Sequence, residues 1–218
     1  MGKLRAIPNA HVVIMAVLPI VLNMAVTPWI IISMVSLSKF VESPIYYLYV
    51  YGPALWSGYH VVLTIMVYRF LKREGESLKD VVGPLRDKMW LSLFTILGLV
   101  GLSVLMFQIM EPMLTDVIYG SGFMRTFIME YQRIPLASIL YVVLVASFTA
   151  GVCEEIIWRG YLQTRLERKL GGRIWMAITI QALLFGLWHG ISVHAVFTAI
   201  SGFIYGIIYA KTKRLAPT

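Results

Sequence analysis

The sequence predicts an all-α fold, a polytopic integral membrane bundle of six transmembrane helices. Of the 218 residues, 59% are hydrophobic and only 14% are charged, whereas a soluble domain is about half apolar and about a quarter charged. The mean hydropathy is +0.77. Six apolar stretches of roughly 17 residues or more are each close to the length that spans a bilayer. We expect them to form one integral membrane domain over residues 1–218.

The same composition excludes several other classes of protein. A single cysteine, Cys153, excludes an internal disulfide framework. The first apolar stretch is too long for a cleavable secretory signal and lacks a small-residue cleavage site near its end. The net charge is +8, but binding to nucleic acid would need basic residues interleaved with aromatic ones on one folded face. Here the basic residues lie in polar loops, so we expect no nucleic-acid partner.

The six predicted spans follow one another along the chain. Pro19 and Pro28 predict a kink in the first span, whose freed carbonyls find partners inside the bundle. We expect His60 in the second span to be a packing residue and His11, at the entrance of the first, to be interfacial. The spans cover residues 11–37, 45–71, 89–110, 134 onwards, 174–190 and 193–210.

The loops between the spans alternate in basic content. If the spans alternate in direction, all of the 19 Lys and Arg residues except Lys39, Arg125 and Arg133 fall on one side of the membrane. The positive-inside rule assigns that side to the cytoplasm. We therefore expect a multi-pass protein of the cell membrane with a cytoplasmic N terminus.

Two of the loops are long. Residues 69–88 mix basic with acidic residues and are predicted to form a solvated loop on the cytoplasmic side. Residues 111–133 lie on the outer side, where Gly120-Ser121-Gly122 marks a turn. Phe123, Phe127 and Ile128 then predict a short amphipathic helix lying in the membrane interface.

Two adjacent carboxylates interrupt the fourth span. Glu154 and Glu155 follow an apolar run, and Arg159 comes four residues after Glu155. Ionisable groups at membrane depth are costly, and they usually face a partner or a water-filled cavity. On a helix Glu155 and Arg159 are i,i+4 neighbours and can pair, whereas Glu154 points about 100° away. We predict that Arg159 pairs with Glu155 and that Glu154 stays available for another task.

The depth of Glu154 depends on where its helix ends. If the helix ended at Trp158, Glu154 would lie near the cytoplasmic face and could not meet His189 in the next span. If Arg159 is buried, the helix continues to Arg165, Arg168 and Lys169, with Gly171-Gly172 as its stop. At 1.5 Å per residue, Glu154 then lies about 21 Å and His189 about 24 Å from that end. We predict that the two side chains meet inside the membrane.

A carboxylate and an imidazole that meet in this way predict hydrolysis. A carboxylate in a partly dry cavity can act as a general base toward water. A histidine opposite it can hold that water, stabilise an oxyanion or bind a metal ion. Such a cavity would admit water together with a lipid-embedded or lipidated substrate. Cys153 has anionic and apolar neighbours, so we expect it to pack rather than to act as a nucleophile.

These residues carry a resemblance to a known family. Glu154-Glu155-x-x-x-Arg159 resembles the first motif of the CAAX-protease and bacteriocin-processing (Abi) family of intramembrane proteases, which includes the type II CAAX prenyl endopeptidases. Phe185-x-x-x-His189 resembles its second motif. The residues around both motifs agree, with Gly202-x-x-x-Gly206 following the second. The resemblance covers residues 134–218.

The resemblance implies a role for each matched residue. Glu154 would activate the attacking water, and His189 would help to bind that water or a catalytic zinc ion. Glu155, Arg159 and Phe185 would support the site. The residues do not decide whether zinc is required. The implied partners are membrane lipid and a peptide or lipidated protein substrate.

The family pattern continues with a third motif, a His followed four residues later by Asn or another polar residue. The sequence stops at Thr218, where that motif would be approached. We expect the native protein to continue with a further helix. The alternative is that His194, five residues after His189, takes the place of the missing histidine.

Other functions are compatible with the same residues. One is a non-catalytic membrane scaffold or immunity factor that binds a partner through the same cavity. Another is a small transporter that uses Glu154 as its proton or ion site. Transporters often show paired inverted repeats, and the sequence shows no such pairing, which favours the endopeptidase.

Overall fold

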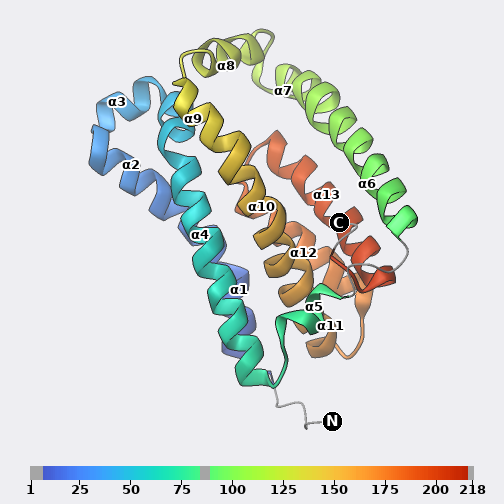
Figure 1. Ribbon diagram of the computed structural model, residues 1–218. Coiled ribbons are helices and arrows are strands. Elements are labelled where there is room, and N and C mark those ends of the chain that lie inside the picture. The colour runs from blue at the N-terminus through green and yellow to red at the C-terminus, as the bar shows by residue number, and fades with distance from the viewer. Residues whose placement is uncertain (1–6, 84–88, 216–218) are drawn as a thin grey trace.

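The computed structural model describes residues 7–83 and 89–215, and within these ranges every regular element is a helix (Figure 1). The predicted all-α membrane bundle is confirmed. Five helical stretches of the described chain are long and apolar enough to cross a membrane: Asn9–Val35, Pro44–Glu74, Leu93–Tyr119, Leu136–Lys169 and Val193–Thr212. Of the basic residues used to predict the topology, Lys3, Arg5, Arg86 and Lys88 lie outside the described residues.

The first span consists of α1 (Asn9–Val21), a π-helical segment η1 (Leu22–Val26) and α2 (Thr27–Val35). Pro19 lies inside α1, and the π-helical segment begins three residues later. Proline removes one hydrogen bond from the helical ladder, and π-helical bulges often accompany such a bend. The predicted kink is confirmed, because α1 and α2 run in different directions (Figure 1).

The second span is one long helix, α4 (Pro44–Glu74), which follows the short α3 (Leu37–Glu42). Gly75 ends α4 in the left-handed conformation, with φ 81°. The short helix α5 (Leu78–Val82) comes next, and its capping box joins Ser77 to Asp80. The hydrogen bonds from the backbone and the hydroxyl of Ser77 lower the pKa of the exposed Asp80 carboxyl.

The third span combines α6 (Met89–Ser103), the π-helical segment η2 (Val104–Met110) and α7 (Glu111–Tyr119). The turn at residues 120–122 leads into α8 (Phe123–Tyr131). The predicted turn and short helix are therefore confirmed, but the first part of the predicted loop is wrong, because the third span continues as a helix to Tyr119. Helices α3 and α8 lie at one end of the bundle, whereas α5 and α11 lie at the other (Figure 1).

The fourth span is a single helix of 34 residues, Leu136–Lys169. It contains α9 (Leu136–Tyr141), η3 (Val142–Ala146), α10 (Ser147–Glu154), η4 (Glu155–Gln163) and α11 (Thr164–Lys169). Gly171 and Gly172 follow with φ 65° and 83°, and the Gly172 amide donates to the Glu167 carbonyl. The longer of the two predicted helices is thus confirmed, with its glycine stop.

The fifth predicted span is shorter than expected. Helix α12 (Ile174–Trp188) has 15 residues, or about 22 Å at 1.5 Å per residue, which is less than the roughly 30 Å of a bilayer's hydrocarbon core. It ends at Trp188 because Gly190 turns the chain with φ 100°. The last span, α13 (Val193–Thr212), packs closely on α12. Gly202 and Gly206 face α12 and allow this approach, as their spacing predicts.

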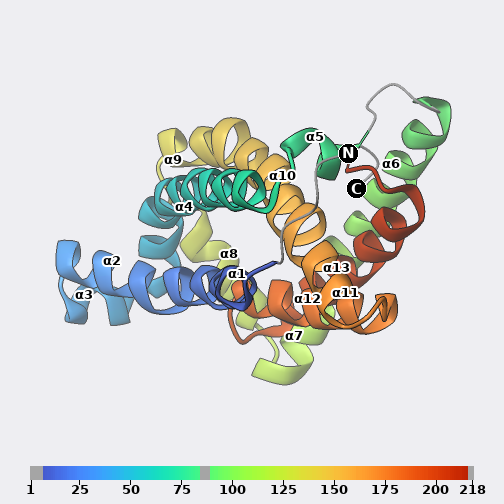
Figure 2. The same ribbon diagram turned by 90° about the horizontal axis from the view of Figure 1, so that it is seen from below.

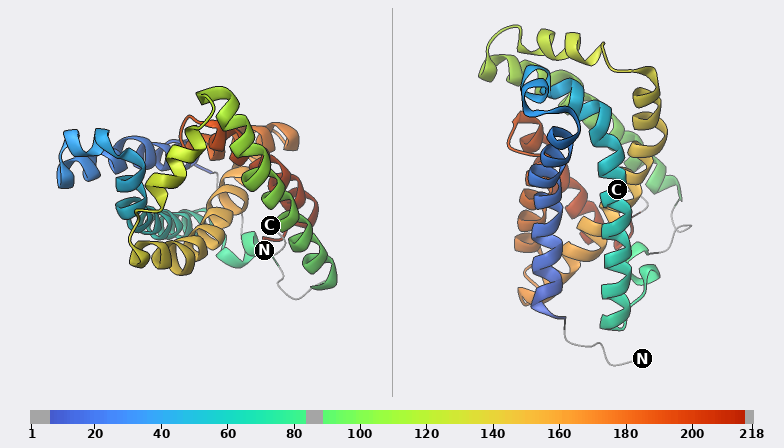
Figure 3. Two further views of the ribbon diagram at one scale, coloured as in Figure 1. Left: turned by 90° about the horizontal axis from the view of Figure 1, so that it is seen from above. Right: turned by 90° about the vertical axis from the view of Figure 1, so that its left-hand side faces the viewer.

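Seen along the bundle, α1, α4, α10 and α12 surround a common interior (Figure 2). Helices α1 and α4 run roughly side by side (Figure 3, right), α4 packs on α10, and α1 packs on α12. The main apolar core lies where α1, α4, η4 and α12 meet, and Met15, Leu63, Trp158 and Phe185 are among its buried members. This arrangement brings the fourth span, which carries the first motif, against the second span, and the fifth span, which carries the second motif, against the first and fourth.

The predicted solvated loop at residues 69–88 is wrong in its first part. Helix α4 continues to Glu74, and the Glu74 side chain is buried. It accepts hydrogen bonds from Tyr161 and Arg165 and pairs with His11. The side chains of His11 and Arg165 are also buried around this carboxylate. Charge alternation in a sequence cannot show that opposite charges from distant segments neutralise one another.

Candidate active site

Glu154 lies at the end of α10, where the fourth span faces the interior of the bundle. Its Oε1 atom is 3.0 Å from Nε2 of His60 on α4. The carboxylate also interacts electrostatically with His189 and Arg159. The two motif residues Glu154 and His189 therefore lie within electrostatic range of each other. The expectation of an unpartnered Glu154 needs correction, because His60 occupies one of its oxygens.

His189 follows the last residue of α12, so its ring emerges where the helix stops. Its Nδ1 atom is 3.0 Å from the carbonyl oxygen of Phe185. A carbonyl can only accept a hydrogen bond, so Nδ1 carries the hydrogen and Nε2 of the neutral ring keeps its lone pair. The Phe185 ring packs against the imidazole edge to face, with centroids 5.0 Å apart. Phe185 thus fixes both the tautomer and the orientation of His189.

The end of α12, next to His189, is held by residues of the first two spans. Asn23 of η1 donates a hydrogen bond to the carbonyl of Trp188, one of the carbonyls that a helix end leaves without an intrahelical partner. The Trp188 ring lies 5.8 Å from the His60 ring, measured between centroids. The position of His189 therefore depends on contacts that reach beyond its own helix.

Arg159 and Glu155 pair within one helix, as the i,i+4 spacing predicts. Nη1 of Arg159 is 2.9 Å from Oε1 of Glu155, and the arginine side chain is fully buried. Among the described residues, no hydrogen bond of normal geometry reaches the guanidinium. The guanidinium instead lies over the rings of Phe185 and Tyr205, whose centroids are 4.3 and 5.2 Å from Cζ. The cation is held by one carboxylate and two aromatic faces.

His194 lies near His189 but is occupied by another partner. The two imidazole centroids are 5.6 Å apart, and Nδ1 of His194 is 3.0 Å from a carboxylate oxygen of Glu111. The His194 side chain is 47% exposed. His194 therefore lies between the His189 ring and α7, and it is partly exposed.

Residues 136–218 match a family model described as type II CAAX prenyl endopeptidase Rce1-like. The predicted family resemblance is confirmed over this segment. The match begins at the first residue of α9 and includes Glu154, Glu155, Arg159, Phe185, His189 and His194. No curated protein and no solved structure matches the chain.

The Rce1-like match and the apolar helices together describe a multi-pass membrane protein with similarity to peptide-cleaving enzymes. The match covers less than half of the chain, and helices α1 to α8 lie before it. His60 belongs to that preceding part, on α4.

Sequence reasoning missed His60, Asn23 and Glu111, which hold Glu154, Trp188 and His194. The clue for His60 was present, because an ionisable residue inside a membrane span usually has a specific partner. What the sequence could not provide was the partner's identity, since 94 residues separate His60 from Glu154. The expected packing role of His60 is incomplete, because its ring nitrogen contacts the central carboxylate.

The described residues contain no group of three or more His, Cys, Asp or Glu side chains that could hold a metal ion. Glu154 is engaged by His60, and Nδ1 of His194 is engaged by Glu111. Among the residues that the structure describes, this arrangement of donors does not fit a zinc site.

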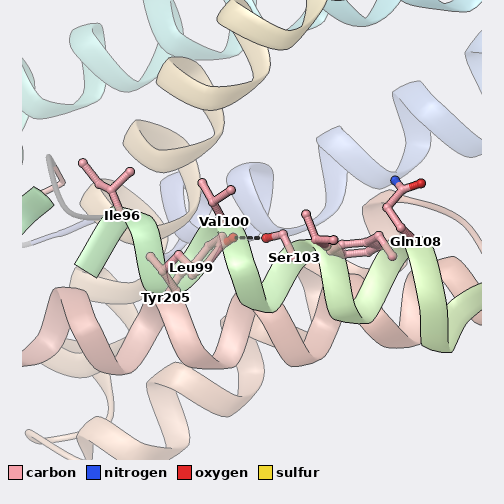
Figure 4. A pocket seen from close by; sticks show the side chains of 8 residues that line it. Ile96, Leu99, Val100, Ser103, Gln108 and Tyr205 are labelled. Atoms are coloured by element: carbon pink, nitrogen blue, oxygen red, sulfur yellow. Dashed lines mark hydrogen bonds between the residues drawn. The ribbon is translucent and has the colours of Figure 1, made fainter. Parts of the chain in front are cut away.

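A groove of about 350 Å³ lies between α6–η2 and α13 (Figure 4). The side chains of Ile96, Val100 and Ser103 come from α6, and Tyr205 comes from α13. The Ser103 and Tyr205 hydroxyls are 3.4 Å apart. Neither Glu154 nor His189 lines this groove. The candidate active site is therefore defined by the polar contacts inside the bundle and not by this surface.

Proposed function

We propose that the protein is an intramembrane endopeptidase that hydrolyses peptide bonds of membrane-associated substrates. The family match suggests prenylated C-terminal peptides as the substrate class. The observation that carries the proposal is the contact of His60 with both motif regions: its Nε2 atom is 3.0 Å from Glu154 Oε1, and its ring lies against Trp188, the residue before His189. Glu154 and His189 also interact electrostatically. A carboxylate held near an imidazole can act as a general base toward a water molecule that both groups contact.

In this mechanism Glu154 and His189 share the attacking water. The Nε2 lone pair of His189 accepts one hydrogen bond from the water, because Nδ1 already donates to Phe185. The Glu154 carboxylate takes a proton from the water as its oxygen bonds to the carbonyl carbon of the substrate. The peptide C–N bond then breaks, and the proton on Glu154 passes to the departing amine nitrogen.

The other motif residues support this pair. Arg159 neutralises Glu155 and interacts electrostatically with Glu154, and it lies over the rings of Phe185 and Tyr205. Phe185 contributes both to that stack and to the hydrogen bond that orients His189. One aromatic residue therefore connects the two motifs.

The test is cleavage of a farnesylated fluorogenic peptide by the 218-residue chain in nanodiscs. We expect Glu154→Gln and His189→Gln each to lower kcat by at least about 100-fold, since general-base catalysis is worth roughly 10²–10⁴-fold. Glu130→Gln is the matched control. That carboxylate is on α8 at the end of the bundle, where it lies 3.9 Å from Arg133.

The same experiment separates the proposal from its alternatives. Cleavage that survives both substitutions in well-folded protein would overturn the endopeptidase. The non-catalytic scaffold or immunity factor would be favoured if the wild-type chain cleaves no peptide and both variants keep its biological effect. Proton or ion flux in proteoliposomes, abolished by Glu154→Gln, would favour the transporter.

A further inference from the structure

We infer that His60 of α4 is a positioning residue for Glu154, supplied from outside the segment that matches the family. The inference rests on the proposed function, because it assigns a role in the same site. It concerns a buried imidazole whose polar contact is with the proposed general base.

The surroundings of His60 make a purely packing role a poor explanation. The residue is 4% exposed, and its Nε2 atom is 3.0 Å from Glu154 Oε1. Its other nitrogen, Nδ1, has no hydrogen-bond partner among the described residues. Burying a polar ring costs free energy unless the ring is hydrogen-bonded, and an ionisable residue inside a membrane span usually has a specific partner. For His60 that partner is the Glu154 carboxylate.

Helices α4 and α10 are also joined by a polar contact that does not involve His60. About one helical turn earlier, Thr149 of α10 donates a hydrogen bond to Ser57 of α4 at 3.2 Å. A second polar contact between the same two helices is therefore already present. The His60 contact differs from the Thr149–Ser57 contact because its acceptor is the Glu154 carboxylate.

The geometry defines what His60 does. A carboxylate accepts hydrogen bonds, so Nε2 of His60 carries the hydrogen and donates it to Oε1. This bond fixes the carboxylate plane and leaves the second oxygen, Oε2, to receive the proton of the attacking water. Contact of the His60 ring with Trp188, next to His189, ties the orientation of the base to the residue opposite it.

The test compares His60→Gln with His60→Met under the same peptide assay. Glutamine places an amide N–H near the position of Nε2, whereas methionine has a similar shape without a donor. We expect His60→Met to lower kcat by about 10–100-fold, the usual effect of losing a residue that orients a site group, with KM unchanged. We expect His60→Gln to keep most of the wild-type kcat.

Ser57→Ala is the matched control, because it removes the other hydrogen bond between α4 and α10. We expect it to leave kcat unchanged. If His60→Met fails to insert, His60→Asn replaces it, since its amide falls at the Nδ1 position, away from Glu154.

Three results would overturn the positioning role: full activity of the donor-less variant, an equal loss in His60→Gln, or an equal loss in Ser57→Ala. A failure of the proposed function is recognised separately, because Glu154→Gln would then still cleave. In that case the proposed role of His60 is overturned as well. If instead Glu154→Gln abolishes cleavage as expected but His60→Met keeps the wild-type kcat, only the positioning role is overturned.

Discussion

At the scale of single residues, Arg159 is the most constrained side chain of the candidate site. It is fully buried, pairs with Glu155 and contacts two aromatic rings. An arginine in this position combines charge with a flat surface that stacks on aromatic rings. A lysine would keep the charge and lose the stacking.

We predict that Arg159→Met destabilises the protein strongly and that Arg159→Lys has an intermediate effect. Removing one partner of a buried ion pair costs about 3–5 kcal/mol. Thermal unfolding in nanodiscs measures both. In the double variant Arg159→Met/Glu155→Gln, part of the loss should be recovered, because neither charge remains. Equal stability of Arg159→Met and the wild type would show that the pair is not important for stability.

The residue scale also shows what a sequence can predict. The pair of Glu155 and Arg159 is predictable because both lie on one helix at a fixed spacing. The contact of His60 with Glu154 depends on the register between two helices that are distant in the chain. Nothing local fixes that register, so the partner of the buried histidine could be expected but not named.

At the scale of the elements, the packing of α12 on α13 depends on small residues. The spacing of Gly202 and Gly206 predicts a close approach, and the structure confirms it. Gly186 on α12 is the tightest of these contacts, because a Cβ there would lie 2.7 Å from the backbone carbonyl oxygen of Ala195. Backbone cannot move aside as a flexible side chain can.

We predict that Gly186→Ala lowers the thermal stability of the bundle, because α12 and α13 must separate to make room. Gly98→Ala is the matched control, since Gly98 is on α6 and a Cβ added there would meet no atom within 4 Å. In a helix interior, alanine is about 1 kcal/mol more favourable than glycine, so the control should be neutral or stabilising. A Gly186→Ala variant as stable as Gly98→Ala would show that the two helices can separate at little cost.

At the scale of the whole molecule, a buried ionic cluster joins the two parts of the chain. Glu74 of α4 pairs with His11 of α1, both of which precede the segment that matches the family. It also accepts hydrogen bonds from Tyr161 and Arg165, which lie inside that segment. The first spans are therefore attached to the helix that carries the motifs.

The topology prediction shows the limit of sequence reasoning at this scale. At one end of the bundle Arg168 pairs with Glu76 and Lys213 pairs with Glu167, and Lys72 lies in the last turn of α4. That grouping follows from the alternation of charged loops. The burial of Glu74 and Arg165 does not follow, because it depends on which loop folds back on which helix.

We predict that Glu74→Gln weakens the attachment of α1 and α4 to the fourth span and lowers the thermal unfolding midpoint. The Glu74 and Arg165 side chains are only 1% and 0% exposed, so losing the carboxylate charge removes a partner from a buried ion pair, at a cost of about 3 kcal/mol. Glu167→Gln is the matched control. Its carboxylate is 3.3 Å from Lys213, with the two side chains 25% and 56% exposed, and such surface pairs are worth about 0–1 kcal/mol.

If the two substitutions shift the midpoint equally, the cluster does not hold the two parts of the chain together. If only Glu74→Gln does so, and cleavage falls with it, the spans outside the matched segment are needed to keep Glu154 and His189 in place.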